Sequence, residues 1–318
     1  MKTNFGLLIF YCFCFFNGNS LLAQEQKIEV RPYTIQTTYE KLKSDYPFIK
    51  PIEALKSGPF ISKENLIYTS IEGRDLKADV FIPKDTSEKR PAILLVFGGG
   101  WISGSKANVK PLAQHFAANG YVAVTVDYRL STEAVYPAAV KDLKAAIRWM
   151  RDHAEEFHID SKKIAILGNS AGAQLATLVG VTGNSEIYKD EQNTTSDVVQ
   201  AILNIDGIVS FTHPESEEGA IAAKWLDGKR RENLKNWEEA SPLTHVSETT
   251  PPTLFVNSAQ PRFHAGRDDM LQILEQHNIY NEVHTLPDTP HSFWLMQPWF
   301  YTTLQYCLSF LGRVFNTE

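Results

Sequence analysis

The chain has 318 residues, of which 43% are hydrophobic, and a formal net charge of -6. This apolar content is enough for one large core, and the sequence contains neither a basic tract that would favour nucleic-acid binding nor an acidic run typical of disorder. We therefore expect a globular protein of one domain, residues 24–318, that binds no nucleic acid.

The N-terminal 23 residues have the pattern of a secretory signal peptide. Lys2 provides a positive start, the apolar stretch 5–16 is too short to span a bilayer, and Ala23 is a small residue suited to cleavage. We therefore expect an exported protein, secreted or periplasmic, without a membrane span. Removal of this segment leaves Cys307 as the single cysteine, so the mature fold is expected to lack an internal disulfide.

Hydrophobic periodicity predicts an alternation of strands and helices after a proline-punctuated lead-in, residues 24–60, with one short helix near 39–43. Strands are predicted at 66–71, 76–82, 92–97, 121–126, 164–167, 201–208, 253–257 and 282–286, and helices at 109–118, 137–150, 173–179, 220–225, 233–239, 268–277 and 301–315. Strands that alternate with helices of this length imply an α/β fold with a mostly parallel sheet and helices on both faces. The charged segment 212–247 is interpreted as a small cap insertion over the site.

The segment Gly168-Asn-Ser-Ala-Gly172 joins a buried strand to a helix of small residues. In such a G-x-S-x-G elbow, glycines allow strand and helix to pass closely, and the serine hydroxyl projects from the top of the sheet. Ser170 is therefore the candidate nucleophile, and the Ala171 N–H, at the helix start, would face an oxyanion.

Two further segments complete an acyl-transfer pattern. His291 follows the last predicted strand, downstream of the serine, where a general base is expected. Gly98-Gly99-Gly100 ends a buried strand upstream, and Gly99 and Gly100 are predicted to join Ala171 as oxyanion-hole donors. We expect this chemistry to need no metal and no other cofactor.

At this point the chain resembles the alpha/beta-hydrolase superfamily, and within it the branch of hormone-sensitive-lipase-like esterases and bacterial acetyl-xylan or feruloyl esterases. The resemblance runs from about Leu66 to Leu311. It is carried by residues 97–101 (FGGGW), 127–130 (DYRL), 136–139 (YPAA) with Asp142 and 147–149 (IRW), 168–172 (GNSAG), 251–253 (PPT) and His291.

The sequence departs from this branch at two places. The branch usually has a histidine before its glycines, which we expect to orient the glycine loop, and this chain has Phe97. The family also normally places its catalytic aspartate a few residues after the strand 253–257, but residues 257–264 (NSAQPRFH) contain no carboxylate.

Three aspartates remain candidates for orienting His291. Asp206 ends the preceding strand, resembling lipases that carry their acid at that position. Asp268 is the second choice and Asp269 the third; both lie at a helix start, where an acidic side chain is also typical of capping.

The prediction about the substrate depends on three residues that lie close together in the loop where the acid is expected: Arg262, His264 and Arg267. Guanidinium groups bind carboxylates bidentately, so this cluster predicts recognition of an acidic sugar; a salt bridge to Asp268, Asp269, Glu217 or Glu218 that fixes the loop is the other interpretation. Segments 262–269, 206–207 and 213–218 more weakly resemble secreted bacterial esterases associated with pectin breakdown. A sugar-stacking wall would draw on Trp101, Phe293, Trp294, Trp299 and Phe300.

We therefore expect a serine carboxyl-ester hydrolase that removes acetyl or methyl groups from ester-substituted oligo- or polysaccharides of the plant cell wall, such as pectin or hemicellulose. A general small-ester carboxylesterase or lipase is the alternative within that chemistry. A peptidase of the same fold is disfavoured because no propeller-like N-terminal domain precedes the catalytic region. A hydrolase fold without activity, used to bind carbohydrate, is the alternative from another functional class.

Overall fold

The computed structural model describes residues 30–183, 185–190 and 193–316. The predicted signal peptide, residues 1–23, lies outside these ranges. Among the helices within them, none combines the length and apolar character that a bilayer crossing requires.

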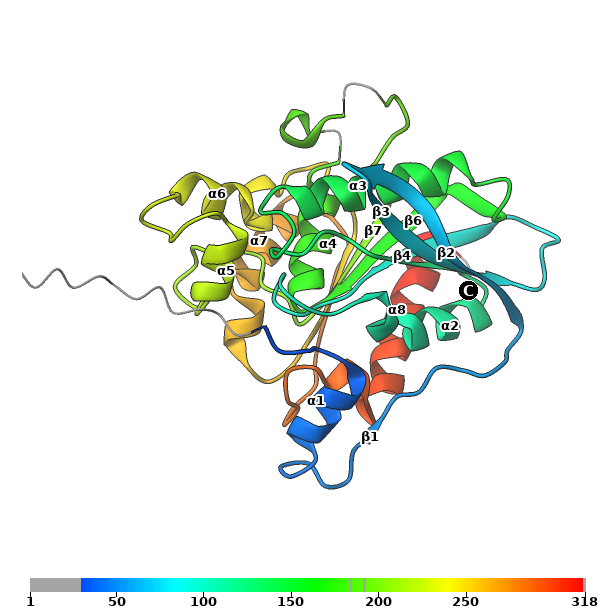
Figure 1. Cartoon of the computed structure of the whole chain (residues 1–318), viewed down its shortest axis with the longest axis horizontal. Helices are drawn as coiled ribbons and strands as arrows, with labels where there is room; N and C mark the ends of the chain where they lie inside the picture. Colours follow the sequence, from blue (N-terminus) through cyan, green and yellow to red (C-terminus); the bar gives the residue numbers. More distant parts are fainter. Residues whose placement is uncertain (1–29, 184, 191–192, 317–318) are drawn as a thin grey trace, which may run out of the picture.

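The central element is an eight-stranded sheet with the order β2-β3-β5-β4-β6-β7-β8-β9 (Figure 1). Strand β3 runs antiparallel to both of its neighbours, β2 and β5, and the pairs from β5 to β9 are all parallel. The strands are β2 (Phe60–Ile71), β3 (Arg74–Pro83), β4 (Arg90–Val96), β5 (Val122–Val126), β6 (Ile159–Asn169), β7 (Ala201–Ile205), β8 (Thr253–Asn257) and β9 (Asn281–Thr285). This sheet confirms the predicted alpha/beta-hydrolase architecture.

Helices cover both faces of this sheet. In the view of Figure 1, α3 (Ala138–Asp152) and α4 (Ala171–Val181) lie above the sheet, and α2 (Lys110–Ala118) and α8 (Trp299–Phe315) lie below it. Strands β4, β5, β7 and β8 are buried almost throughout, because helices on both sides exclude water from both faces.

The remaining helices lie at the edges of this arrangement. The segment predicted as a cap carries α5 (Ala220–Trp225) and α6 (Leu234–Glu239), beside α7 (Arg267–Gln276) in Figure 1. The lead-in carries α1 (Ile35–Leu42) and β1 (Lys50–Pro51), which pairs with β10 (Met296–Gln297). Short 3-10 helices are η1 (Lys106–Asn108), η2 (Glu186–Tyr188), η3 (Pro242–His245), η4 (Pro261–His264) and η5 (Phe293–Leu295).

The predicted strand 201–208 is too long, and the difference has a local cause. Strand β7 ends at Ile205 because Asp206 has a φ of 53°, which turns the backbone out of the sheet. The Asn204 side-chain oxygen accepts the Gly207 N–H at 2.9 Å and closes this turn. Asp206 therefore stands at the carboxyl end of the sheet rather than within a strand.

A buried ion cluster anchors the far end of α4. Lys144, on α3, is 1% exposed, and its Nζ donates to the carbonyl of Thr182, the C-cap of α4, at 2.7 Å, and to Asp197 Oδ1 at 3.0 Å. Arg148 Nη1 donates to the other oxygen of Asp197 at 3.0 Å. Burial lowers the pKa of Lys144, and the carboxylate of Asp197 opposes that shift. Asp197 is thus the counter-charge that allows a lysine to be buried behind α4.

Replacement of Asp197 by alanine is expected to lower the free energy of unfolding by about 3–5 kcal/mol, because it leaves a buried cation without a counter-charge. Asp190→Ala is the matched control. Asp190 also pairs with Arg148, but its side chain is 40% exposed, so its loss should cost at most about 1 kcal/mol. Urea unfolding of the two variants measures the difference. Equal destabilisation of both would show that the ion pair with Lys144 is not what stabilises this region.

Candidate active site

Ser170 lies in the sharp turn between β6 and α4, at the carboxyl end of the sheet. Its backbone has φ 54° and ψ -128°, outside the ordinary helix and strand regions. Its N–H donates to the carbonyl of Ile205 at 2.9 Å, which ties the turn to the neighbouring strand β7. A non-glycine residue in such a conformation persists only where the surroundings over-determine it, and such strain is concentrated at functional sites.

The glycines on each side of Ser170 are required by close backbone approach. A Cβ on Gly168 would lie 1.9 Å from the carbonyl oxygen of Gly172, and a Cβ on Gly172 would lie 2.4 Å from the carbonyl oxygen of Val96. A Cβ on Gly207 would lie 2.6 Å from the carbonyl oxygen of Ser170. The elbow and the β7 turn are thus packed backbone to backbone, which holds the serine in place.

His291 and Asp206 form a hydrogen-bonded chain with this serine. Ser170 Oγ lies 2.8 Å from His291 Nε2, and His291 Nδ1 lies 2.7 Å from Asp206 Oδ2. The Asp206 side chain is fully buried, and its other oxygen accepts the backbone N–H of Ser258 at 2.9 Å. Because the Asp206 carboxylate accepts a hydrogen bond from the Nδ1–H of His291, Nε2 is left without a proton and can accept that of the serine. The structure thus brings Ser170, His291 and the first-choice acid together.

The other two acid candidates lie elsewhere. Asp268 pairs with the neighbouring Arg267, and its side chain is 72% exposed. Asp269 lies 3.5 Å from His213 Nε2. Both lie in the first turn of α7, where an acidic side chain is typical of helix capping. The structure thus places Asp206, and neither Asp268 nor Asp269, against His291.

The glycine loop supplies backbone donors near Ser170. The Gly98 N–H is engaged by Asn169 Oδ1 at 2.9 Å, and Gly100 and Ala171 line the same cavity as Ser170. Gly99 has a φ of 128° and Gly100 a φ of 62°, conformations that favour glycine. Gly99 does not line the cavity; its carbonyl accepts the N–H groups of the following turn. Gly100 and Ala171 are therefore the better placed of the three predicted donors.

Phe97, which replaces the histidine usual in this branch, has partners of its own. Its ring stacks on Tyr128 with ring centroids 4.3 Å apart, and the Tyr128 hydroxyl donates to the Phe97 carbonyl at 2.8 Å. Aromatic packing and a tyrosine hydrogen bond thus anchor the start of the glycine loop, together with Asn169 in the elbow.

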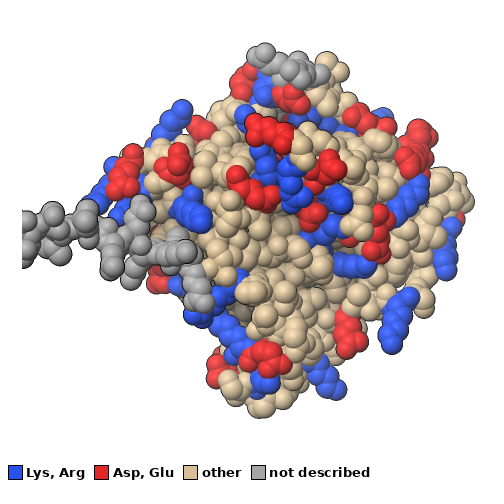
Figure 2. Space-filling view, in the orientation of Figure 1, with Lys and Arg blue, Asp and Glu red and all other residues tan. Residues whose placement is uncertain are grey.

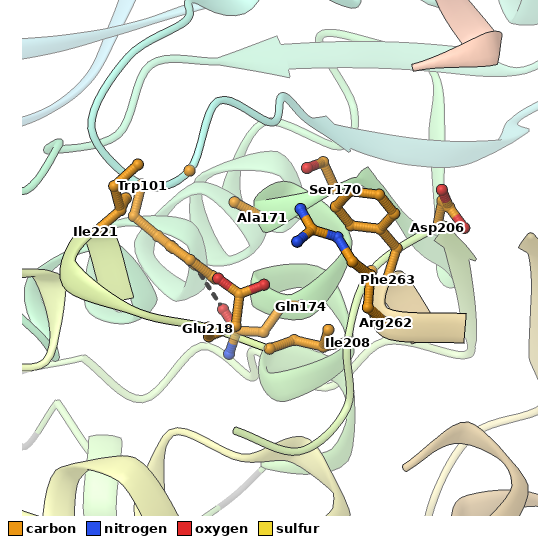
Figure 3. Close-up of a pocket in the computed structure, with 12 residues that line it drawn as sticks. Trp101, Ser170, Ala171, Gln174, Asp206, Ile208, Glu218, Ile221, Arg262 and Phe263 are labelled. Carbon is orange, nitrogen blue, oxygen red and sulfur yellow. Dashed lines mark hydrogen bonds between the residues drawn. The ribbon is translucent and has the colours of Figure 1, made fainter. Parts of the chain in front are cut away.

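A cavity of about 140 Å³ opens beside Ser170 (Figure 3). Trp101 and Ile221 lie on one side of it, and Ser170 and Phe263 on the other. Trp101 is 4% exposed; its indole N–H donates to Gln174 at 2.9 Å, and its ring stacks on Trp225 of the cap. Trp101 therefore contributes an edge to the cavity while its ring face packs against the cap.

The charged side chains of Arg262 and Glu218 extend into this cavity (Figure 3). The Arg262 guanidinium lies 4.4 Å from the ring centroid of Phe263, and its Nη1 donates to Glu217 at 3.0 Å. Burial raises the pKa of Glu218, and the charge of Arg262 opposes the shift. A guanidinium and a carboxylate thus share the space in front of Ser170.

The other two members of the predicted substrate cluster do not line the cavity. Arg267 is held by Asp268 and by Asn257 Oδ1, the latter at 2.9 Å. Burial lowers the pKa of His264, and the neighbouring Arg267 adds to that shift. The salt bridge of Arg267 to Asp268 matches the loop-fixing interpretation, and of the three predicted substrate-binding residues only Arg262 lines the cavity.

The predicted aromatic wall does not form. Phe293, Trp294 and Phe300 are each at most 2% exposed and pack within the core, because η5 and the start of α8 turn these rings inward. Trp299 packs instead on Phe48 of the lead-in, with ring centroids 5.7 Å apart.

Two aromatic residues near this segment, Phe263 beside His291 and Tyr33 beside Ser292, were not identified from the sequence. The Phe263 ring stacks on the imidazole with centroids 3.6 Å apart, and Tyr33 in the lead-in lies 3.3 Å from the hydroxyl of Ser292. Burial raises the pKa of Tyr33 to about 12. The only sequence signal for Phe263 was its position between Arg262 and His264, both predicted to bind substrate. No sequence signal marked Tyr33.

Two further observations concern the surface charge and the side chains able to bind a metal ion. Acidic and basic side chains are interspersed over the face shown in Figure 2, without an extended area of one sign. Among residues 30–183, 185–190 and 193–316, no three His, Cys, Asp or Glu side chains converge as metal ligands would.

The sequence is similar to those of known esterases. The BD-FAE family profile matches residues 78–268. The probable carboxylic ester hydrolase LipM of Mycobacterium tuberculosis is 29% identical over 224 residues, covering 67% of this chain and 51% of LipM. Esterase LipC of the same organism is 29% identical over 215 residues, covering 65% of this chain and 53% of LipC. The chain thus spans about half the length of the curated relatives it matches.

Solved structures give the same fold. The butyrate-bound esterase Est2 of Thermogutta terrifontis is 27% identical, with a TM-score of 0.67, over 80% of this chain and 94% of that one. A bifunctional GH43-CE protein of Bacteroides eggerthii, 23% identical with a TM-score of 0.68, covers 80% of this chain and 38% of that one, and shows the fold alone. The profile match spans more than half of the sequence. The chain belongs to the BD-FAE family, an esterase family of the alpha/beta-hydrolase fold.

Proposed function

We propose that this protein is a serine carboxylic-ester hydrolase that works through an acyl-enzyme. The observation that carries the proposal is the hydrogen-bonded chain from Ser170 Oγ through His291 to the buried Asp206. The names of the relatives, which are esterases and carboxylic ester hydrolases, support the same chemistry.

The proposed reaction follows from the positions of these atoms. Ser170 Oγ bonds to the ester carbonyl carbon as its proton passes to His291 Nε2, and the Gly100 and Ala171 N–H groups stabilise the resulting oxyanion. The carbon–oxygen bond to the alcohol then breaks, and His291 returns the proton to the departing oxygen. A water molecule, activated by the same imidazole, attacks the acyl-enzyme and releases the acid while Ser170 regains its proton.

The finer proposal is that the natural substrates are acetyl or methyl esters of plant cell-wall polysaccharide, met outside the cytoplasm after cleavage of residues 1–23. Two side chains in the cavity support a sugar as the substrate. Carboxylates accept hydrogen bonds from hydroxyl groups, which suits Glu218, and guanidinium groups bind carboxylates, which suits Arg262 toward a uronate. A cavity of about 140 Å³ suits a small acyl group.

The test is a comparison of released acid and alcohol from several esters. The full mature chain would be incubated with p-nitrophenyl acetate, acetylated xylan and acetylated, methylated pectin, and acetate and methanol would be quantified. Release from the polysaccharides supports the finer proposal. Hydrolysis of p-nitrophenyl acetate alone would favour a general carboxylesterase, and hydrolysis of none of them would overturn the enzyme proposal for these substrates.

Replacement of Arg262 by glutamine is expected to lower kcat/KM on acetylated oligogalacturonides about 10- to 100-fold, because charge-assisted hydrogen bonds contribute about 1.5–3 kcal/mol. Acetylated xylo-oligosaccharides, which lack the carboxylate, should lose less than about threefold. Arg267→Gln is the matched control, because that guanidinium lies outside the cavity, and any effect of it should be equal for both substrates. Equal losses with Arg262→Gln would remove uronate recognition from the proposal.

A further inference from the structure

The loop after β8 contacts both His291 and Asp206, although it contains neither of them. Its first residue, Ser258, donates its backbone N–H to Asp206 at 2.9 Å. Five residues further on, in η4, the ring of Phe263 lies parallel to the imidazole of His291, with an interplanar angle of 11° and a centroid separation of 3.6 Å. The loop thus orients the acid through its backbone and touches the base through an aromatic face.

The hydrogen bonds of His291 leave one motion of its ring unrestrained. Nε2 bonds to Ser170 and Nδ1 to Asp206, and two such bonds do not by themselves prevent a tilt of the ring about the line joining the two nitrogens. Phe263 closes one face of the ring against that tilt, and Trp294 meets it at 86° with centroids 5.0 Å apart. Since proton transfer depends on the direction of the nitrogen lone pair, this restraint bears on the rate.

Phe263 also presents its π face to a charge that exists only during reaction. When Ser170 attacks, the imidazole becomes an imidazolium, and an aromatic face attracts a cation in contact with it. Arg262 already uses that property of the ring, with its guanidinium carbon 4.4 Å from the centroid and its Nη1 held by Glu217. An interaction that is strongest with the imidazolium favours the transition state over the bound ester.

We propose that Phe263 is a positioning residue for His291, which holds the imidazole plane in line with Ser170 and stabilises the imidazolium formed on attack. This inference rests on the proposed esterase function. It assigns to the loop after β8 a role in holding the base, in a chain whose acid, Asp206, directly follows the neighbouring strand β7.

The experiment compares Phe263→Leu and Phe263→Met with Phe263→Tyr. Leucine and methionine keep an apolar side chain without a π face, whereas tyrosine keeps the ring. With p-nitrophenyl acetate, the first two are expected to lower kcat about 3- to 30-fold, which corresponds to the usual range of a cation–π contact, with KM unchanged. The tyrosine variant should retain at least about half of the wild-type kcat. Fluorophosphonate labelling of Ser170 should slow in parallel with kcat.

A spectroscopic readout separates positioning from a general effect on folding. The proton between His291 Nδ1 and Asp206 should give a far-downfield NMR resonance in the wild-type and tyrosine variants, broadened by exchange in the leucine and methionine variants. Melting temperatures of all variants would be compared. Phe48→Leu, which removes an aromatic side chain that is 61% exposed in the lead-in, is the control and should leave kcat unchanged.

Three outcomes would overturn the inference. Wild-type kcat in the leucine and methionine variants removes the role of the ring, and a tyrosine variant as slow as leucine removes the role of its π face. A rise in KM with kcat unchanged would make Phe263 a substrate contact instead. If the wild-type protein neither hydrolyses p-nitrophenyl acetate nor labels with fluorophosphonate, the proposed function itself fails, which is distinguishable from these results.

Discussion

Replacement of Ser170 by alanine is expected to lower kcat on p-nitrophenyl acetate by about 10³- to 10⁶-fold, because it removes the hydroxyl that His291 would deprotonate. The residual rate would come from the oxyanion donors and binding alone. The free energy of unfolding should change little, because the lost hydroxyl bonds to the imidazole of His291 and the backbone of the turn is retained.

The measurement combines steady-state kinetics with fluorophosphonate labelling and a melting curve. The wild-type protein should incorporate one label at Ser170 and the alanine variant none. Ser62→Ala, on the exposed side of β2, is a control that should match the wild type in both assays. A folded Ser170→Ala variant with wild-type turnover would exclude the proposed acyl-enzyme.

Asp206→Asn is expected to lower kcat by about 10⁴-fold with little change in KM. An amide can no longer act as the charged acceptor for His291 Nδ1–H, so the imidazole loses the tautomer in which Nε2 accepts the serine proton, and the imidazolium loses its counter-charge. The asparagine oxygen can still accept the Ser258 N–H, so the turn after β7 should survive.

Asp268→Asn provides the matched control for this prediction. It makes the same chemical change in a side chain that is 72% exposed and paired with Arg267, and kcat should stay within about twofold of the wild type. Parallel kinetics of the two variants decide the assignment of the acid. A large loss in Asp268→Asn with near-normal activity in Asp206→Asn would reverse it.

Local patterns were sufficient for most of the fold. The apolar runs that became β4, β7 and β8, and the small-residue helix α4, were recognisable because strands buried on both faces lack polar alternation and because the elbow needs glycines on both sides of Ser170. The differences lie at element ends such as that of β7, where the positive φ of Asp206 depends on the turn closed by Asn204, and in the short strands β1 and β10, which were not predicted.

Such local patterns do not predict which distant segments come into contact. Asp206 and Asp268 are both acidic residues after or near a predicted strand, and sequence distance does not distinguish them, because reach to His291 depends on the packing of β7 beside β8. Arg262 and Arg267 are likewise the same residue type on one loop, yet only Arg262 lies in the cavity. The ring of Phe263 contacts the imidazole of His291 because of how the loop after β8 packs in the folded protein.

The amino-acid sequence by itself thus determined the alternation of strands and helices, the strained serine turn and the chemical type of the site, since these depend on neighbouring residues and their periodicity. Tertiary structure alone decided which aspartate faces the imidazole, which arginine enters the cavity and which aromatic side chains pack inward. The physical reason is that hydrogen bonds and ring contacts act over a few ångströms, and only the packed sheet brings Asp206, Phe263 and His291 within that range.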